Sequence, residues 1–342
     1  MISNLAPATV RTLPVWQRAL QDAFARPAEL LDYLGIDPGL PSLGPAALRA
    51  FPLRVPRGYA ARMRKGDPRD PLFLQVWPAQ QEANVVAGFA KDAVGDLASL
   101  KDGGVIRKYE GRALVIATGA CGVHCRFCFR RHFPYGDALA SRDHWQAALE
   151  QIASDRSIHE VILSGGDPLA LADDKLAEFA EALEFLPHVK RLRIHTRQPI
   201  VLPERVDGAL LCWLRRGRLQ KVVVVHANHA NELDQSVADA MHSLRGAGVT
   251  LLNQSVLLRG VNDTVADQQR LAERLFECGV MPYYLHLLDR VDGTAHFEVR
   301  PEEGASIVQQ MSAKLPGYLV PKLVREEAGA PAKTPVTAAG IA

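Results

Sequence analysis

The pattern of hydrophobic and polar positions changes near residue 110. Before that point, apolar residues recur at helical spacing over residues 15–25, and the prolines from Pro27 to Pro68 divide the next stretch into short pieces. This pattern predicts a mainly helical accessory region over residues 1–105. After that point, short runs rich in β-branched residues alternate with longer amphipathic runs, which is typical of strands alternating with helices.

The second part of the chain predicts six strands with helices between them. The expected strands span residues 113–118, 160–163, 191–196, 221–226, 250–257 and 281–288. The expected helices span residues 142–153, 173–185, 203–216, 231–246 and 264–278. The continuous valine run at 222–225 suits a strand buried on both faces of a parallel sheet. We therefore predict an α/β fold, a partial or full (β/α) barrel over residues 106–325, with its chemistry on loops after the strand ends.

The composition places the chain among globular proteins and limits its partners. Of its 342 residues, 48% are hydrophobic and 23% are charged, which is enough to build a full core. The 40 basic and 38 acidic residues give a net charge of +2, so we expect no nucleic acid partner. No run reaches the roughly 18 apolar residues of a membrane helix, and the first residues lack a secretory signal. We expect a cytoplasmic protein that does not contact a membrane.

Three of the five cysteines lie within eight residues, directly after the first predicted strand. Cys121, Cys125 and Cys128 have the spacing CxxxCxxC, which lets three thiolates on one tight loop face a common centre. Structural disulfides are rare in the cytosol. A [4Fe–4S] cluster held by only three thiolates leaves one iron open, and that iron can bind a substrate or cofactor.

Other interpretations of this cysteine cluster stay open on spacing alone. A zinc site could take His124 or His132 as its fourth ligand, and thiols could also serve only to pack a core. The other two cysteines, Cys212 and Cys278, are isolated within expected helices, and we interpret them as structural.

A glycine-rich turn with the sequence LSGGDP follows the second predicted strand. Its glycines let the backbone approach a ligand closely. Together with CxxxCxxC and with Phe127 just before the third cysteine, this turn resembles the radical S-adenosylmethionine (SAM) superfamily. The resemblance implies a [4Fe–4S] cluster on the three clustered cysteines, whose open iron binds SAM and whose electron releases a 5′-deoxyadenosyl radical. It also implies SAM contacts from Gly165, Gly166 and Asp167.

Further motifs resemble one family of that superfamily, the lysine 2,3-aminomutases. They are CFRRHFPY at 128–135, NQSVLL at 253–258, VND at 261–263, PYYL at 282–285 and GYLVP at 317–321. The resemblance runs from about residue 50 to the tail. It implies an isomerase that uses pyridoxal phosphate as well as SAM, with L-lysine as its substrate.

The resemblance assigns roles to four residues outside the cysteine loop. Lys333, in a C-terminal segment over residues 326–342, matches the lysine that forms the internal aldimine with pyridoxal phosphate, so this segment should pack at the barrel mouth. Arg130 matches the residue that binds the substrate carboxylate, for which a planar guanidinium is well suited. Asp289 and Glu326 match acidic positions that hold the ε-ammonium group of the substrate. Negative charge at this end favours lysine over glutamate, because like charges repel.

The block at 128–135 most resembles the branch of the family that serves translation elongation factor P. In that branch L-α-lysine becomes (R)-β-lysine, which a separate ligase attaches to the factor. The short end after Lys333 is expected from the same branch. The reaction would need a reducing electron donor such as flavodoxin or ferredoxin, and we allow for a homo-oligomer. The alternatives are a free-standing catabolic lysine 2,3-aminomutase, a non-catalytic iron–sulfur or zinc module, and a regulatory protein that binds the factor.

Several polar residues near the expected strand ends carry no assignment. His195, His226, His229 and His286 could line the barrel mouth, or they could have no chemical role. The polar side chains at 253–255 could donate to a phosphate or to adenosine. The stretch from residue 324 onward is rich in small residues and prolines, and we expect it to be loop.

Overall fold

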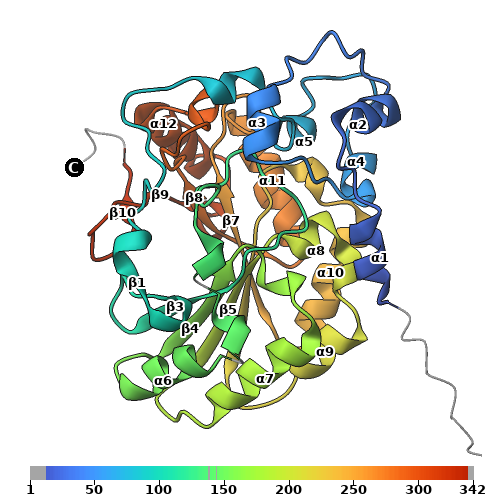
Figure 1. Cartoon of the computed structure of the whole chain (residues 1–342). Coiled ribbons are helices and arrows are strands. Elements are labelled where there is room, and N and C mark those ends of the chain that lie inside the picture. The colour runs from blue at the N-terminus through green and yellow to red at the C-terminus, as the bar shows by residue number, and fades with distance from the viewer. Residues whose placement is uncertain (1–12, 138, 144, 338–342) are drawn as a thin grey trace, which may run out of the picture.

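One sheet of ten strands runs through the described residues, 13–137, 139–143 and 145–337, with the strands side by side in chain order. Figure 1 shows this chain as a computed structural model. The predicted accessory region and C-terminal segment include residues 1–12 and 338–342, which lie outside the described residues. The strands are β1 (Leu100–Lys101), β2 (Val105–Ile106), β3 (Arg112–Thr118), β4 (Glu160–Gly165), β5 (Arg191–Thr196), β6 (Gln220–Val225), β7 (Thr250–Val256), β8 (Met281–His286), β9 (Lys322–Arg325) and β10 (Thr334–Pro335).

Strands β3 to β9 pair in parallel, whereas β1, β2 and β10 pair in antiparallel fashion at the two ends of the sheet. Within the described part of the chain, the edge strands β1 and β10 do not pair with each other, so the barrel is partial. The six predicted strands correspond to β3 through β8, and their ends differ by at most two residues. The predicted (β/α) fold is thereby confirmed, in its open form.

The helices of the described residues cover the outside of the sheet and one of its ends. None of them is long and apolar enough to cross a membrane. Three of the short N-terminal helices begin at a proline, where the missing N–H is not needed. The helices are α1 (Val15–Gln21), α2 (Pro27–Leu34), α3 (Pro45–Ala50), α4 (Arg57–Ala61), α5 (Pro71–Leu74), α6 (Gln146–Ser154), α7 (Asp173–Glu184), α8 (Gln198–Val201), α9 (Gly208–Leu214), α10 (Gln235–Gly246), α11 (Val265–Glu277) and α12 (Pro301–Ser312).

Capping residues explain why some helices begin later than predicted. The side chains of Asp207 and Asp234 accept hydrogen bonds from amides in the first turns of α9 and α10. The predictions over 203–216 and 231–246 therefore began several residues too early. The helix expected from residue 142 also begins late, at Gln146, although no side chain of the described residues caps its first turn.

The tail was predicted incorrectly, because it is not all loop. Val324 is buried within β9, and Thr334 and Pro335 pair with Arg325 and Val324 as strand β10. Helix α12 was also not predicted. A two-residue strand such as β10 is defined by its partner and has too few residues to show a periodicity of its own.

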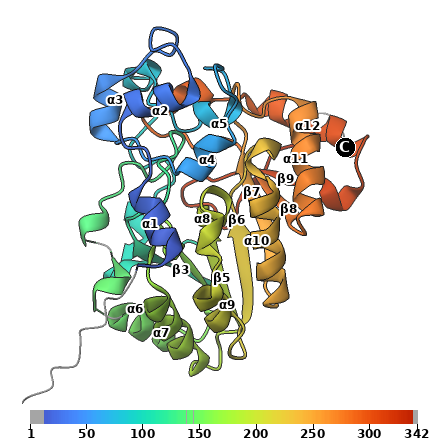
Figure 2. The same ribbon diagram turned by 90° about the vertical axis from the view of Figure 1, so that its right-hand side faces the viewer.

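Apolar clusters fix the helices to the sheet, and two of them are the largest among the described residues. The larger lies between the parallel strands and the helices outside them, with Phe179, Trp213 and Leu244 among its fully packed side chains. The second lies within the N-terminal helices and takes in Val123 and Val201 from the barrel. In Figures 1 and 2, α1 lies lower, beside the barrel, and helices α2 to α5 gather at one end of the sheet. They therefore cover the end at which the cysteine loop lies.

Candidate active site

A cavity of about 330 Å³ lies at the carboxyl ends of the parallel strands. Its walls come from the cysteine loop after β3, from the ends of the following strands, from residues just before β3 and from the tail. All ten residues assigned from the sequence line it, namely Cys121, Cys125, Cys128, Arg130, Gly165, Gly166, Asp167, Asp289, Glu326 and Lys333. Residues from both ends of the barrel sequence thus meet in one site.

The three clustered cysteines lie together on the cavity wall. Burial raises the pKa of the Cys121 thiol well above its ordinary value, and the neighbouring Cys128 and Cys125 sulfurs raise it further. Burial also raises the pKa of Cys128 to about 11, again with a contribution from Cys125. Such thiols ionise readily only when a positive centre binds them. Three cysteine sulfurs at one cavity wall are the kind of ligand that a [4Fe–4S] cluster takes.

The three cysteines line one cavity but are not grouped as ligands of a single metal ion. Within the described residues, no three His, Cys, Asp or Glu side chains are grouped so as to hold one metal ion. The thiolates of a [4Fe–4S] cluster bind different irons, so they do not need to converge on one ion. Both histidines considered as zinc ligands have other partners. His124 Nδ1 lies 2.7 Å from Pro52 O, and His132 Nε2 lies 3.1 Å from Asp292 O.

The glycine-rich turn after β4 packs directly against the cysteine loop. The Gly166 amide donates to Thr118 O at 2.6 Å, and a Cβ on Gly166 would lie 2.4 Å from Ala120 O. Gly165 has a φ of +121°, which side chains other than hydrogen rarely permit. Its carbonyl accepts a hydrogen bond from Tyr135 Oη at 2.9 Å. Glycine is thus required at both positions by close backbone contact.

Asp167 follows the two glycines, but its carboxylate points into the protein. One oxygen accepts from Thr196 Oγ1 at 2.6 Å and from the Leu169 amide at 3.0 Å, and the other accepts from the amides of Arg197 and Gln198 at 2.6 and 2.9 Å. Burial raises the pKa of Asp167, although these hydrogen bonds oppose the rise. The carboxylate fixes the loop after β5. Its assignment to SAM stays a prediction, for which the backbone of the turn offers the contact.

Arg130 is buried at the cavity wall and already holds a carboxylate of the protein. Its Nε donates to Asp96 Oδ2 at 2.7 Å and its Nη1 donates to Ser164 Oγ at 2.9 Å, while Lys108 Nζ lies 2.5 Å from Asp96 Oδ1. Burial disfavours the Asp96 carboxylate, but Arg130 and Lys108 outweigh it and lower the pKa of Asp96. A guanidinium in this position can pair with a ligand carboxylate.

The C-terminal segment brings an ion pair to the cavity wall, where Lys108 Nζ lies 3.8 Å from Glu326 Oε1. Lys333 Nζ donates to Glu326 Oε2 at 2.6 Å, and Tyr109 Oη donates to Glu326 Oε1 at 2.6 Å. Burial alone would raise the pKa of Glu326, but Lys333 and Tyr109 outweigh it and the pKa is lowered. Burial raises the pKa of Asp289 to about 7, although the Lys333 ammonium opposes the rise. Near neutral pH, Glu326 is therefore charged and Asp289 is partly protonated.

The floor of the cavity offers nitrogen atoms with unused hydrogen-bonding capacity. Arg193 Nε, His195 Nε2 and His286 Nε2 are buried and have no hydrogen-bond partner within the described residues. Burial lowers the pKa of His195 and His286 well below the ordinary value and that of His226 to about 3, so these imidazoles are neutral. His226 Nε2 lies 2.8 Å from Gln254 Nε2. Unpaired nitrogens of this kind suit a polar or anionic cofactor group.

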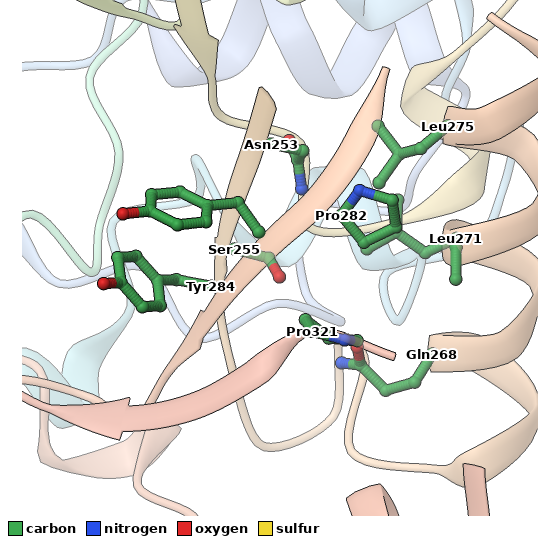
Figure 3. A pocket seen from close by; sticks show the side chains of 10 residues that line it. Asn253, Ser255, Gln268, Leu271, Leu275, Pro282, Tyr284 and Pro321 are labelled. Atoms are coloured by element: carbon green, nitrogen blue, oxygen red, sulfur yellow. The ribbon is translucent and has the colours of Figure 1, made fainter. Parts of the chain in front are cut away.

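Two residues considered in the sequence do not line this cavity. His229 Nε2 lies 3.6 Å from Asp267 in a separate contact. Both polar atoms of the Asn253 side chain are bonded to the backbone of Ala227, at 2.8 and 3.1 Å. Figure 3 shows Asn253 with Leu275 at a small pocket between β7, β8 and α11. Asn253 therefore has a structural role in joining β6 to β7.

Sequence reasoning missed several polar residues that line the cavity, among them Asp96, Lys108, Tyr109, Arg193 and Arg197. The first three precede β3 and belong to no motif. Arg197 directly follows β5, and the rule that parallel strands carry function at their carboxyl ends could have found it.

An open parallel barrel with three cysteines after its first parallel strand indicates the radical SAM class of enzyme, and the radical SAM superfamily matches residues 115–210. The chain is 48% identical over 322 residues to the L-lysine 2,3-aminomutase of Escherichia coli, with 94% of each chain covered. It is 45% identical over 319 residues to that of Haemophilus influenzae, covering 93% of this chain and 94% of the other. That of Clostridium subterminale is 34% identical over 279 residues, covering 81% of this chain and 67% of the other.

This chain belongs to the lysine 2,3-aminomutase family. It is an enzyme of the isomerase class, and its superfamily implies a [4Fe–4S] cluster and SAM.

Proposed function

We propose that this chain converts L-α-lysine to (R)-β-lysine with a [4Fe–4S] cluster, SAM and pyridoxal phosphate. The observation that carries the proposal is that Lys333, from the tail, lies in the same cavity as the three clustered cysteines. When bound, the cluster and SAM supply a hydrogen-abstracting radical, and pyridoxal phosphate supplies the π-system through which the amino group moves. The relatives at 48% and 45% identity carry the name of this activity.

Different cavity residues would bind the substrate and each of the cofactors. We assign Cys121, Cys125 and Cys128 to the cluster and the backbone of the glycine-rich turn to SAM. Lys333 would hold pyridoxal phosphate through its amine. The unpaired nitrogens of Arg193 and His195 offer donors to polar groups of that cofactor.

The substrate would be gripped at both ends. Arg130 faces the cavity with a planar guanidinium, and a substrate carboxylate would share or replace its pairing with Asp96. Asp289 and Glu326 supply negative charge for the ε-ammonium group at the other end. Gripping both ends fixes the carbon chain against rotation, and such positioning carries much of the rate enhancement of an enzyme.

We further propose that the product serves the modification of translation elongation factor P in the cytoplasm. The block at 128–135 supports this destination by its resemblance to that branch of the family. The cluster would draw its electron from a donor such as flavodoxin or ferredoxin. A catabolic aminomutase would share the same residues and differ only in the fate of β-lysine.

An anaerobic assay tests the activity directly. The reconstituted enzyme, supplied with L-lysine, SAM, pyridoxal phosphate and a reductant, should form β-lysine, and chiral chromatography should identify the R enantiomer. Omission of SAM and the Cys125→Ala variant are the matched controls. The absence of β-lysine from an enzyme that has bound iron and pyridoxal phosphate would contradict the activity. Zinc in place of iron would favour the non-catalytic module.

A strain that lacks this enzyme tests the proposed use of β-lysine. Elongation factor P isolated without this enzyme should lack the mass of one β-lysyl group, and added (R)-β-lysine should restore it. A factor that stays fully modified in the deletion strain would favour the catabolic alternative.

A further inference from the structure

Arg197 is a buried cation that contacts a cysteine of the cluster loop. It directly follows β5, and only 7% of its surface is exposed. Its Nη1 donates to Cys125 Sγ at 2.8 Å. Its backbone amide is held by Asp167 Oδ2 at 2.6 Å, so the loop that carries it is tied to the glycine-rich turn. The proposed grip on the substrate does not use it.

Elements far apart in the chain hold the guanidinium in this orientation. Its Nη2 donates to Gln75 Oε1 at 2.6 Å, to Glu232 Oε2 at 2.8 Å and to Tyr59 Oη at 3.2 Å. Tyr59 lies on α4 and Gln75 ends α5, so two of the three acceptors come from the N-terminal helices. All three acceptor side chains are fully buried. The Glu232 carboxylate offsets much of the cost of burying the cation.

The position of Nη1 has a consequence for a cluster bound at Cys125. The sulfur is a free thiol here, and as an iron ligand it would be a thiolate with negative charge. Reduction adds one electron to the cluster and moves no proton, so the total negative charge grows by one. A fixed positive donor at the sulfur stabilises this added charge, and hydrogen bonds to cluster sulfurs are known to set reduction potentials.

We propose that Arg197 is a positioning residue that raises the reduction potential of the cluster through its hydrogen bond to Cys125 Sγ. The N-terminal helices then have a function at the active site, because Tyr59 and Gln75 aim the guanidinium at the sulfur. A one-electron donor can load the cluster more easily as a result. This inference rests on the proposed cluster at the three cysteines, and it does not depend on the identity of the substrate.

The test is the midpoint potential of the reconstituted cluster, followed by electron paramagnetic resonance without SAM or lysine. Arg197→Gln removes the charge, and Arg197→Lys keeps the charge but loses the planar fork. We expect Arg197→Gln to lower the ratio of reduced to oxidised cluster at a fixed potential at least tenfold, which corresponds to about 59 mV for one electron. Arg197→Lys should shift the midpoint in the same direction by less.

Arg205→Lys is the matched control. Arg205 is also fully buried and ion-paired, to Asp173, but it does not line the cavity. The Arg205→Lys substitution should leave the midpoint potential of the cluster unchanged. A wild-type midpoint in either Arg197 variant with full iron content would overturn the proposal. If neither variant assembles a cluster, Tyr59→Phe decides, because it removes one acceptor of the guanidinium and should lower the midpoint. A wild-type midpoint there would equally overturn it.

The outcome is separable from the proposed function. If the enzyme forms β-lysine but the Arg197 variants show no shift in midpoint potential, the proposed function stands and the role of Arg197 is refuted. If the enzyme forms no β-lysine but the variants shift the midpoint potential, the proposed role of Arg197 stands and the proposed function is refuted.

Discussion

Replacing Asp289 by asparagine should weaken the binding of lysine and change its dependence on pH. The substitution keeps the size of the side chain and removes only its capacity for negative charge. Burial raises the pKa of Asp289 to about 7, so the carboxyl is protonated in acid and must ionise to pair with an ammonium group. Substrate binding in the wild type should therefore weaken as the pH falls below about 7.

The magnitude follows from this pKa. Each pH unit below the pKa of about 7 costs about 1.4 kcal/mol, so KM for lysine should be roughly tenfold higher at pH 6 than its alkaline limit. The Lys333 ammonium opposes the rise in the pKa of Asp289, and linkage to a cofactor would remove that charge. The rise in KM toward acid pH, which is the acid limb of the profile, should then begin at or above neutral pH. Losing the charge pair should cost about 2 kcal/mol, or roughly 30-fold in KM at pH 8.

The assay is the initial rate of β-lysine formation against lysine concentration, from pH 5.5 to 8.5. Asp289→Asn should raise KM at pH 8 and abolish the acid limb, with a smaller effect on kcat. Asp292→Asn, three residues away and outside the cavity lining, is the control. An unchanged KM together with the wild-type acid limb in Asp289→Asn would refute the assignment of the ε-ammonium site.

The same variant also has an expected effect on stability. The folded pKa of Asp289 lies above the ordinary value of 3.8, so the ionised side chain costs stability that grows as the pH rises between these two values. Asparagine removes this cost. The melting temperature of Asp289→Asn at pH 8 should therefore equal or exceed that of the wild type, which separates loss of binding from loss of folding.

Three further substitutions test the cofactor sites. Cys125→Ala should remove the iron–sulfur absorbance and lower the iron content, and a fully coloured, active variant would exclude this cysteine as a ligand. Lys333→Ala should lose the visible band that forms on adding pyridoxal phosphate, whereas an unchanged spectrum would move the linkage to another lysine. Gly166→Ala puts a methyl group 2.4 Å from Ala120 O, so it should cost about 1–3 kcal/mol of stability and weaken SAM binding at least tenfold by calorimetry. An unaltered dissociation constant would contradict the close contact.

The barrel strands could be predicted because their signal is local. The valine run at 222–225 forms the buried strand β6, and the strand ends were found to within two residues. Helix starts were less accurate where a capping residue such as Asp234 lies inside an apolar pattern. The tail strands could not be predicted, because Thr334 and Pro335 are ordered by their pairing with β9.

The residues of the site also fall into two groups, those with a local sequence signal and those placed by contacts between distant segments. The cysteines and the glycine-rich turn form compact motifs that a sequence displays directly. Asp96 reaches Arg130 across 34 positions, and Tyr109 reaches Glu326 across 217. Contacts over such separations leave no periodic trace in one sequence. They are found only when the fold brings the segment before β3 beside the tail.

The open edge of the barrel explains how a tail lysine enters the site. Strand β9 extends the parallel sheet beyond β8, and β10 returns beside it in antiparallel register, with Thr334 opposite Arg325. Glu326 directly follows Arg325, and Lys333 directly precedes Thr334, so both lie next to this pair on the side of the connecting loop. The register itself thus brings them together as the ion pair of 2.6 Å. The residues between them form the loop of this hairpin, in which Gly329 has a φ of +80°. The position of Lys333 in the cavity therefore depends on strand pairing, which the loop sequence does not reveal.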